Sequence, residues 1–129
     1  MNNVLFFNEI DSSEIPGLLA QCHVGLVALH PKHRTHNVPG KFVSYVQYGL
    51  PVLARVSAGT DIARLIDERG IGKVYVGDSV VELRRLAEEL VEDEDARVSM
   101  SERGRELGRV MFSPAAAARR VISSADRVK

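Results

Sequence analysis

The sequence predicts an α/β fold: a Rossmann-like parallel sheet with helices on both faces and extra helices at the C-terminus. Short apolar runs alternate along the chain with longer segments of helical periodicity, and glycine-containing turns separate many of them. The apolar runs show little polar alternation, which is typical of parallel strands buried on both faces. The order strand–helix–strand–helix–strand–helix–strand, then helices, favours a single layered α/β domain.

Four strands are expected, each a short run rich in branched or aromatic side chains. They cover residues 4–7, 24–29, 51–54 and 72–76. Helices are expected between and after them because apolar residues recur there at helical spacing. The first helix begins near Pro16, the second covers about residues 41–48, and the third lies between the turn at residues 57–60 and Gly70. A fourth has an apolar face from Val80 to Val91, and two more cover about residues 94–110 and 115–125.

Composition narrows the class of protein. The 129 residues are enough for one domain with a single core. Lys and Arg number 17, as do Asp and Glu, so no global field attracts nucleic acid or an acidic membrane. The single cysteine, Cys22, cannot form an internal disulfide, and no apolar run approaches the roughly 18–20 residues that span a bilayer. With no basic leader at the start, these features predict a cytoplasmic protein.

The loop between the second strand and the next helix is the most distinctive segment. Its basic side chains are His30, Lys32, His33, Arg34, His36 and Lys41. Zinc is one candidate ligand for the histidines, but Pro31 and Pro39 disfavour the helix that this spacing would need, and the neighbouring cations repel a metal ion. A nucleic-acid patch would need aromatic platforms that this loop lacks. A solvated basic loop with no ligand stays a further alternative.

An anion-binding loop agrees best with the position of this segment. In an open parallel sheet, ligands bind outside the carboxyl ends of the strands, where loops lead into helices. The helix after Gly40 would direct its free N–H groups toward this loop. Gly40 lets a phosphate approach the backbone, and Lys41 adds a positive charge near Ser44 on the same side of the helix. The loop therefore predicts an anion site at the helix N-terminus.

Residues 37–54, NVPGKFVSYVQYGLPVLA, resemble the donor-binding segment of group 1 glycosyltransferases of the GT-B fold. Residues 6–10, 14–19 and 23–27 are similar to the strand, helix and strand that precede this segment in the family. Residues 58–62 and 70–72 resemble its next loop and turn, and residues 112–113 its C-terminal signature. The resemblance covers nearly the whole chain, and it implies the C-terminal half of a GT-B fold.

The family resemblance implies a transferase that takes a sugar from a nucleotide donor, here a UDP- or GDP-sugar, without a metal or other cofactor. It implies a hexosyltransferase, usually retaining, that serves bacterial surface polysaccharide such as lipopolysaccharide. The acceptor would be a glycan or a lipid-linked sugar held by an N-terminal domain, with no nucleic-acid partner. The full enzyme would lie in the cytoplasm, with room for peripheral association at the inner membrane face.

The resemblance also assigns candidate donor-binding residues by position. Five of them would lie near the sugar, the diphosphate or the ribose, and two would border the base; the five are His36, Asn37, Gly40, Lys41 and Ser44, and the two are Glu9 and Ile10. Ser44 and His36 stand where many members carry a pair of glutamates. A serine offers one hydrogen bond but not a charged bidentate contact.

Residues 1–129 match one partial domain, truncated at its start relative to the family, and the catalytic residues would belong to the missing N-terminal domain. Sugar transfer needs donor and acceptor in one closed cleft, so the chain alone is expected to have little or no activity. Two other hypotheses stay open. One is a binding or scaffold domain that has lost catalysis. The other is a receiver-like signalling module, in which Glu9 and Asp11 would imitate an acidic cluster, although the strand at residues 24–29 has no aspartate at its end to be phosphorylated.

Overall fold

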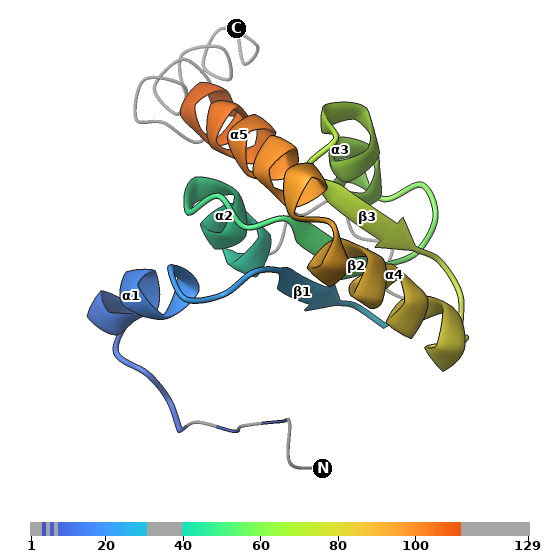
Figure 1. Ribbon diagram of the computed structural model, residues 1–129, viewed down its shortest axis with the longest axis horizontal. Helices are drawn as coiled ribbons and strands as arrows, with labels where there is room; N and C mark the ends of the chain where they lie inside the picture. Colours follow the sequence, from blue (N-terminus) through green and yellow to red (C-terminus); the bar gives the residue numbers. More distant parts are fainter. Residues whose placement is uncertain (1–3, 5, 7, 31–39, 112–129) are drawn as a thin grey trace, which may run out of the picture.

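The computed structural model describes residues 4, 6, 8–30 and 40–111, and these residues form an α/β fold around a parallel sheet. The sheet has three strands in the order β1-β2-β3 (Figure 1), with β1 at Gly25–Ala28, β2 at Val52–Arg55 and β3 at Gly72–Tyr75. All neighbours run parallel. The predicted fold class and three of the four predicted strands are therefore confirmed, with boundaries shifted by one residue or so.

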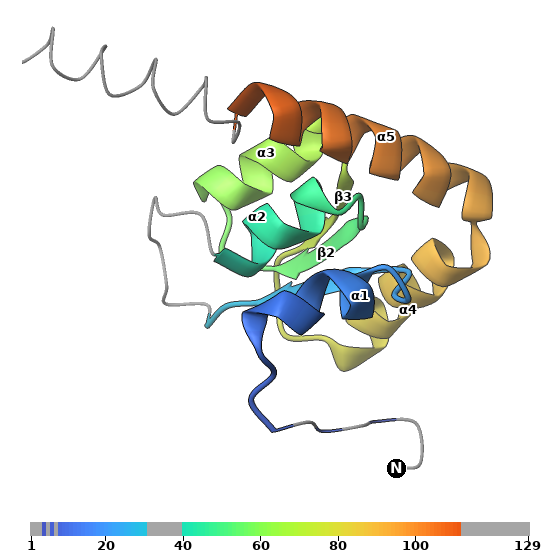
Figure 2. The same ribbon diagram turned by 90° about the vertical axis from the view of Figure 1, so that its left-hand side faces the viewer.

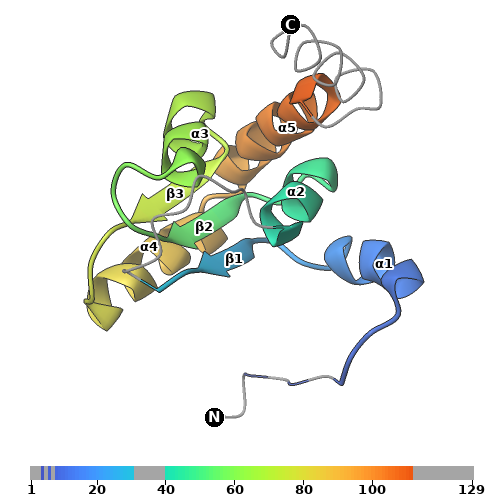
Figure 3. The same cartoon turned by 180° about the vertical axis from the view of Figure 1, so that it is seen from behind.

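Helices cover both faces of the sheet, as the sequence predicts. On one face lie α2, Gly40–Gln47, and α3, Asp61–Arg69, and α5, Glu94–Met111, packs across both of them (Figure 2). The opposite face carries α4, Val80–Glu92, which contacts β2. Figure 3 shows the same arrangement from behind, with the strands between the two helical layers.

The main core lies between the sheet and the helices α2, α3 and α5. Side chains of a strand alternate between faces, so every second residue of each strand points into this layer. In register, Val27 lies beside Ala54, and Val52 lies beside Gly72. Eleven buried residues form the cluster: Val27, Phe42, Val46, Val52, Ala54, Val56, Ile62, Ala63, Ile66, Ile71 and Leu107.

Local chemistry fixes both ends of α3. At its start, the Thr60 hydroxyl accepts a hydrogen bond from the Ala63 N–H, the expected role of an N-cap threonine. At its end, Gly70 adopts a left-handed conformation with φ 62°, and its N–H donates to the Ile66 carbonyl. The predicted helix between the turn at residues 57–60 and Gly70 is therefore confirmed, with its boundaries set by the Thr60 cap and the Gly70 conformation.

The predicted strand at residues 4–7 is wrong as far as the structure describes it. Val4 and Phe6 lie outside any strand, and Phe6 is 93% exposed. A four-residue apolar run forms a strand only where a neighbouring strand pairs with its backbone, and within the described part of the chain neither residue has such a neighbour. Residues 5 and 7 lie outside the described part of the chain.

The helix near Pro16 is present but short. A 3₁₀ turn, η1 at Ser12–Glu14, leads into α1 at Ile15–Leu19. The Asp11 carboxylate accepts a hydrogen bond from the Ser13 N–H and caps η1, and this bond lowers the pKa of Asp11. Pro16 stands in the first turn of α1, where its missing N–H costs nothing.

The predicted apolar face of α4 is correct only in its middle. Leu83, Leu86 and Ala87 are half-buried and Leu90 is fully buried, whereas Val80 and Val91 are exposed. The reason is length, since a helix of 13 residues extends past the four-residue strand that it covers. The helix predicted at about residues 115–125 lies outside the described residues.

Candidate functional site

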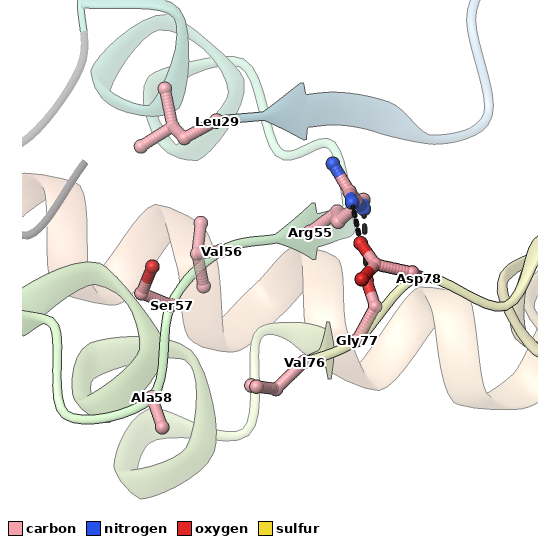
Figure 4. A pocket seen from close by; sticks show the side chains of 8 residues that line it. All are labelled: Leu29, Arg55, Val56, Ser57, Ala58, Val76, Gly77 and Asp78. Atoms are coloured by element: carbon pink, nitrogen blue, oxygen red, sulfur yellow. Dashed lines mark hydrogen bonds and ion pairs between the residues drawn. The ribbon is translucent and has the colours of Figure 1, made fainter. Parts of the chain in front are cut away.

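A pocket of about 250 Å³ lies at the carboxyl ends of the three strands. Its walls are the residues that follow each strand or end it: Leu29, Arg55, Val56, Ser57, Ala58, Val76, Gly77 and Asp78 (Figure 4). Parallel strands all end at the same edge, so residues far apart in sequence meet there. The pocket therefore occupies the place where open parallel sheets bind ligands.

Backbone hydrogen bonds continue past the strand ends and hold the pocket walls in place. The Leu29 N–H donates to the Arg55 carbonyl at 2.9 Å, and the Val56 N–H donates to the Tyr75 carbonyl at 3.2 Å. Leu29 and Val56 are thus attached to the end of the neighbouring strand. The apolar part of the pocket consists of Leu29, Val56, Ala58 and Val76.

An ion pair forms the polar side of the pocket. The Arg55 Nη2 lies 2.6 Å from the Asp78 Oδ1, and the Arg55 Nε donates to the Gly77 carbonyl at 3.1 Å (Figure 4). The Arg55 side chain is 27% exposed and that of Asp78 is 87% exposed. The Arg55 side chain is therefore largely buried in the pocket wall, whereas the Asp78 carboxylate is exposed to solvent.

The turn from Ser57 to Thr60 joins the pocket to the N-terminus of α3. Ser57 and Thr60 are both buried, and the Thr60 hydroxyl donates to the Ser57 carbonyl at 3.0 Å. Gly59 adopts φ 77°, a conformation that favours glycine. Asp61 in the first turn of α3 pairs with Arg64, so this helix end already carries a carboxylate.

The predicted donor-binding residues occupy three positions. Gly40 and Lys41 begin α2 and are exposed, and Ser44 follows one turn later and is half-buried. Glu9 is exposed and Ile10 half-buried in the coil before η1, and His36 and Asn37 lie outside the described residues. None of the five described residues is among those that line the pocket, so their assignment stays a prediction.

Sequence reasoning missed the ion pair of the pocket, Arg55 and Asp78. The signal that points to Arg55 is its place as the last residue of β2, directly at the ligand-binding edge of a parallel sheet. Asp78 follows β3 by three residues, in the turn where Gly77 adopts φ 145°. The two residues are 23 positions apart, and only the pairing of β2 with β3 brings them together.

A second cavity, of about 360 Å³, lies at the opposite end of the sheet. Its walls include residues that precede β1 and β2 and one side of α5: Cys22, His23, Gly49, Leu50, Pro51, Glu94, Arg97, Val98, Ser101, Glu102 and Arg105. Both signs of charge occur there, and the Arg97 guanidinium already donates to the Leu90 carbonyl at 2.7 Å. This cavity shows no concentration of one charge.

Tyr45 of α2 covers the edge strand. Its hydroxyl donates to the Leu26 carbonyl at 3.2 Å, and its ring lies so close to Gly25 that a Cβ there would be 2.5 Å from the ring. Burial raises the pKa of Tyr45, and the nearby Cys22 raises it further. The Cys22 thiol is exposed and donates to the Leu18 carbonyl at 3.4 Å.

Two searches over the described residues bear on the other hypotheses. No group of three or more His, Cys, Asp or Glu side chains there could hold a metal ion, and His33 and His36 of the zinc hypothesis lie outside that part of the chain. Within the same residues, no helix has the length and apolar character to cross a membrane.

The layered helices, the parallel sheet and the pocket at its carboxyl edge define an α/β protein with a Rossmann-like fold. Over 87 residues, the chain is 34% identical to the "Probable glycosyltransferase WbjE" of Pseudomonas aeruginosa. The match covers 67% of this chain and 22% of that protein, so it spans about a fifth of the relative's length. No family model matches the chain, and no solved structure matches it either. The similarity supports a relationship to glycosyltransferases.

Proposed function

We propose that this chain belongs to a glycosyltransferase and binds the nucleotide-sugar donor. The observation that carries the proposal is the 34% identity to a probable glycosyltransferase over 87 residues. The fold agrees with it, since nucleotide ligands commonly bind at the carboxyl edge of a parallel sheet, where the pocket lies. Function depends on the site rather than the fold, so the residues around this edge have to account for the binding.

The N-terminus of α2 binds the diphosphate of the donor. This helix end presents free backbone N–H groups and the positive end of the helix dipole, which attract a diphosphate. Apart from its chain neighbours and the backbone of its own helix, no atom of the described residues lies within 4 Å of the place where a side chain at Gly40 would begin, so a phosphate can approach the backbone closely. Lys41 adds a full positive charge, and Ser44 on the same side of the helix offers a hydroxyl to the ribose.

The remaining donor contacts follow from the resemblance in the sequence. His36 and Asn37 precede α2 and would face the sugar, and Glu9 and Ile10 would border the base. The full enzyme would have the GT-B fold, retain the configuration of a transferred hexose and need no metal. Its acceptor would be a glycan or lipid-linked sugar of bacterial surface polysaccharide, held by the N-terminal domain of the full enzyme.

A titration with nucleotides tests the proposal. UDP, GDP, UDP-glucose and GDP-mannose are added to ¹⁵N-labelled protein, and amide shifts are followed by NMR. We expect saturable shifts at Gly40, Lys41 and Ser44. Lys41→Gln should weaken binding about tenfold, since a charged hydrogen-bond donor is lost. Arg109→Gln removes a cation at the far end of α5 and serves as the matched control.

Two results would contradict the proposal. One is the absence of any saturable shift with all four nucleotides. The other is an equal loss of affinity in the Lys41→Gln and Arg109→Gln proteins, which would indicate a nonspecific charge effect. Incubation with nucleotide sugars and lipid-linked acceptors tests the further expectation that the chain alone does not transfer sugar, and turnover would overturn that part.

A further inference from the structure

The Arg55 guanidinium is the one cation among the described residues that line the carboxyl-edge pocket. Its Nε and Nη2 donate to the Gly77 carbonyl and the Asp78 carboxylate. No interaction of the described structure occupies its Nη1. Figure 4 shows the guanidinium between the side of the pocket formed by Asp78 and the side formed by Leu29. A guanidinium nitrogen with no partner among the described residues can donate to a second anion there.

The partner that holds Arg55 is easily replaced. The Asp78 carboxylate is 87% exposed, and an ion pair with one end in water is weak because water and salt compete for it. The exposed carboxylate can leave Arg55 by a side-chain rotation of Asp78, while the Gly77 carbonyl keeps the guanidinium oriented.

A phosphate is a stronger partner for Arg55 than this carboxylate. The planar guanidinium donates two parallel hydrogen bonds to a phosphate, through Nη1 and Nη2, and such charge-assisted pairs are among the strongest in proteins. The N-terminus of α3 is not an equal competitor, since Asp61 in its first turn already supplies a negative charge. The pocket of about 250 Å³ has room for the phosphate-bearing part of a larger ligand.

We propose that Arg55 is a phosphate-binding residue of this pocket, and that the Asp78 carboxylate pairs with Arg55 until a phosphorylated ligand displaces it. Where the ligand is the nucleotide-sugar donor, a point that rests on the proposed function, Arg55 binds the diphosphate. The exchange prevents the guanidinium from lying unpaired in the empty pocket. Arg55 also supplies a cation at the sheet edge itself, separate from Lys41 at the start of α2.

The test compares inorganic pyrophosphate, UDP and uridine as probes of the full 129-residue chain, with amide shifts and calorimetry as readouts. Wild-type protein should bind pyrophosphate and UDP with shifts at Gly77 and Asp78. Arg55→Gln should lower the affinity for pyrophosphate and for UDP about tenfold, and should leave the affinity for uridine within about twofold of the wild-type value. Asp78→Asn should strengthen pyrophosphate binding by about threefold, since the competing carboxylate is gone.

Two further variants keep the test decisive. Arg84→Gln removes a paired arginine on the exposed side of α4 and should leave every affinity unchanged. Arg55→Lys keeps the charge but loses the bidentate fork, so it should bind pyrophosphate more weakly than wild type and more tightly than Arg55→Gln. If Arg55→Gln does not fold, which circular dichroism reports, Arg55→Lys and the exposed-site variant Asp78→Asn carry the test.

The outcomes separate this inference from the proposed function. If pyrophosphate binding depends on Arg55 and UDP binds no more tightly than pyrophosphate, the result supports the phosphate site and contradicts nucleotide-donor binding. UDP binding that is equal in wild-type and Arg55→Gln proteins supports donor binding and overturns the role of Arg55. Absence of pyrophosphate binding to the wild-type protein overturns the inference as well.

Discussion

The two faces of the sheet are built differently. The face toward α2, α3 and α5 is an apolar core in which Phe42, Val46 and Ile66 are completely buried. The face toward α4 mixes two buried leucines, Leu53 and Leu90, with polar pairs, and Leu26 on the edge strand is 52% exposed. The first face holds the fold together, whereas the second tolerates charges and carries the ion pair that forms part of the pocket.

The polar face is held by ion pairs between the sheet and α4. The Lys73 Nζ lies 2.5 Å from the Glu89 Oε2, and Glu89 also pairs with Arg85. The Arg55–Asp78 pair is the counterpart at the carboxyl edge. Lys73 and Arg55 both point to this face because they are two positions apart in the register of neighbouring strands. The same alternation that builds the core thus places the cation of the pocket.

The largest effect is expected from a cavity in the apolar face. Phe42→Ala removes a fully buried ring and should lower the free energy of unfolding by about 3–5 kcal/mol. Phe6→Ala is the matched control, and the exposed position of Phe6 limits its effect to about 0.5 kcal/mol. Urea unfolding followed by circular dichroism measures both. Equal effects of the two variants would contradict the described core.

A methyl group between two strands should have the next largest effect. Gly72 lies beside Val52 in the sheet, and a Cβ at Gly72 would overlap the Val52 carbonyl. Gly72→Ala is expected to cost about 1–3 kcal/mol, because the backbones of β2 and β3 must move apart. Gly17→Ala has open space and lies in α1, so it should be neutral or stabilise by up to about 1 kcal/mol. A tolerated Gly72→Ala would exclude this strand register.

The edge of the apolar face gives a smaller effect that depends on pH. Tyr45→Phe removes the hydrogen bond to the Leu26 carbonyl and should cost about 0.5–1.5 kcal/mol at neutral pH. Because burial raises the pKa of Tyr45, the folded wild type holds the phenol proton more tightly than the unfolded chain. Wild-type stability should therefore fall as pH rises above 10.0, the ordinary value, and the gap to Tyr45→Phe should close.

The control for this prediction is Tyr48→Phe, which changes an exposed ring directly after the same helix. Chemical unfolding at a series of alkaline pH values measures all three proteins. A gap between wild type and Tyr45→Phe that stays constant through this range would show that Tyr45 ionises equally well in the folded and unfolded states.

The polar face should give the smallest effect. The hydrogen bond from Lys73 lowers the pKa of Glu89, with a further contribution from Arg85. The stabilisation that this pairing gives to the folded state is present above pH 4.5, the ordinary pKa of glutamate, and is lost as pH falls through the lowered pKa of Glu89. Glu89→Gln should therefore lower the melting temperature slightly at neutral pH and not at all in acid. Glu92→Gln, at the exposed end of α4, is the control, and an acid-independent difference would refute the pairing.

The sequence alone predicts the parts of this fold that depend on local signals. The strands of the sheet follow from apolar runs, and α3 follows from Thr60 and Gly70 at its ends. The error at Val4 and Phe6 arises because a strand depends on a neighbour elsewhere in the chain, and local composition does not contain that neighbour.

The candidate site also has parts that local sequence predicts and parts that depend on contacts between distant residues. The N-terminus of α2, with Gly40 and Lys41, can be predicted because a glycine-opened helix after a strand is a local pattern. The contact between Arg55 and Asp78 cannot, since it depends on the pairing of two strands and on the conformation of the turn at Gly77. The contribution of His36 and Asn37 stays a prediction, as both lie outside the described residues.

One measurement tests the central claim most directly, namely that the carboxyl edge of the sheet binds a nucleotide-sugar donor. The ¹⁵N-labelled chain is titrated with UDP-glucose and GDP-mannose, and all assigned amides are followed. We predict saturable shifts concentrated at the start of α2 and at the residues that follow β2 and β3. Shifts confined to the cavity around Cys22 and His23 at the opposite end, or none at all, would contradict the claim.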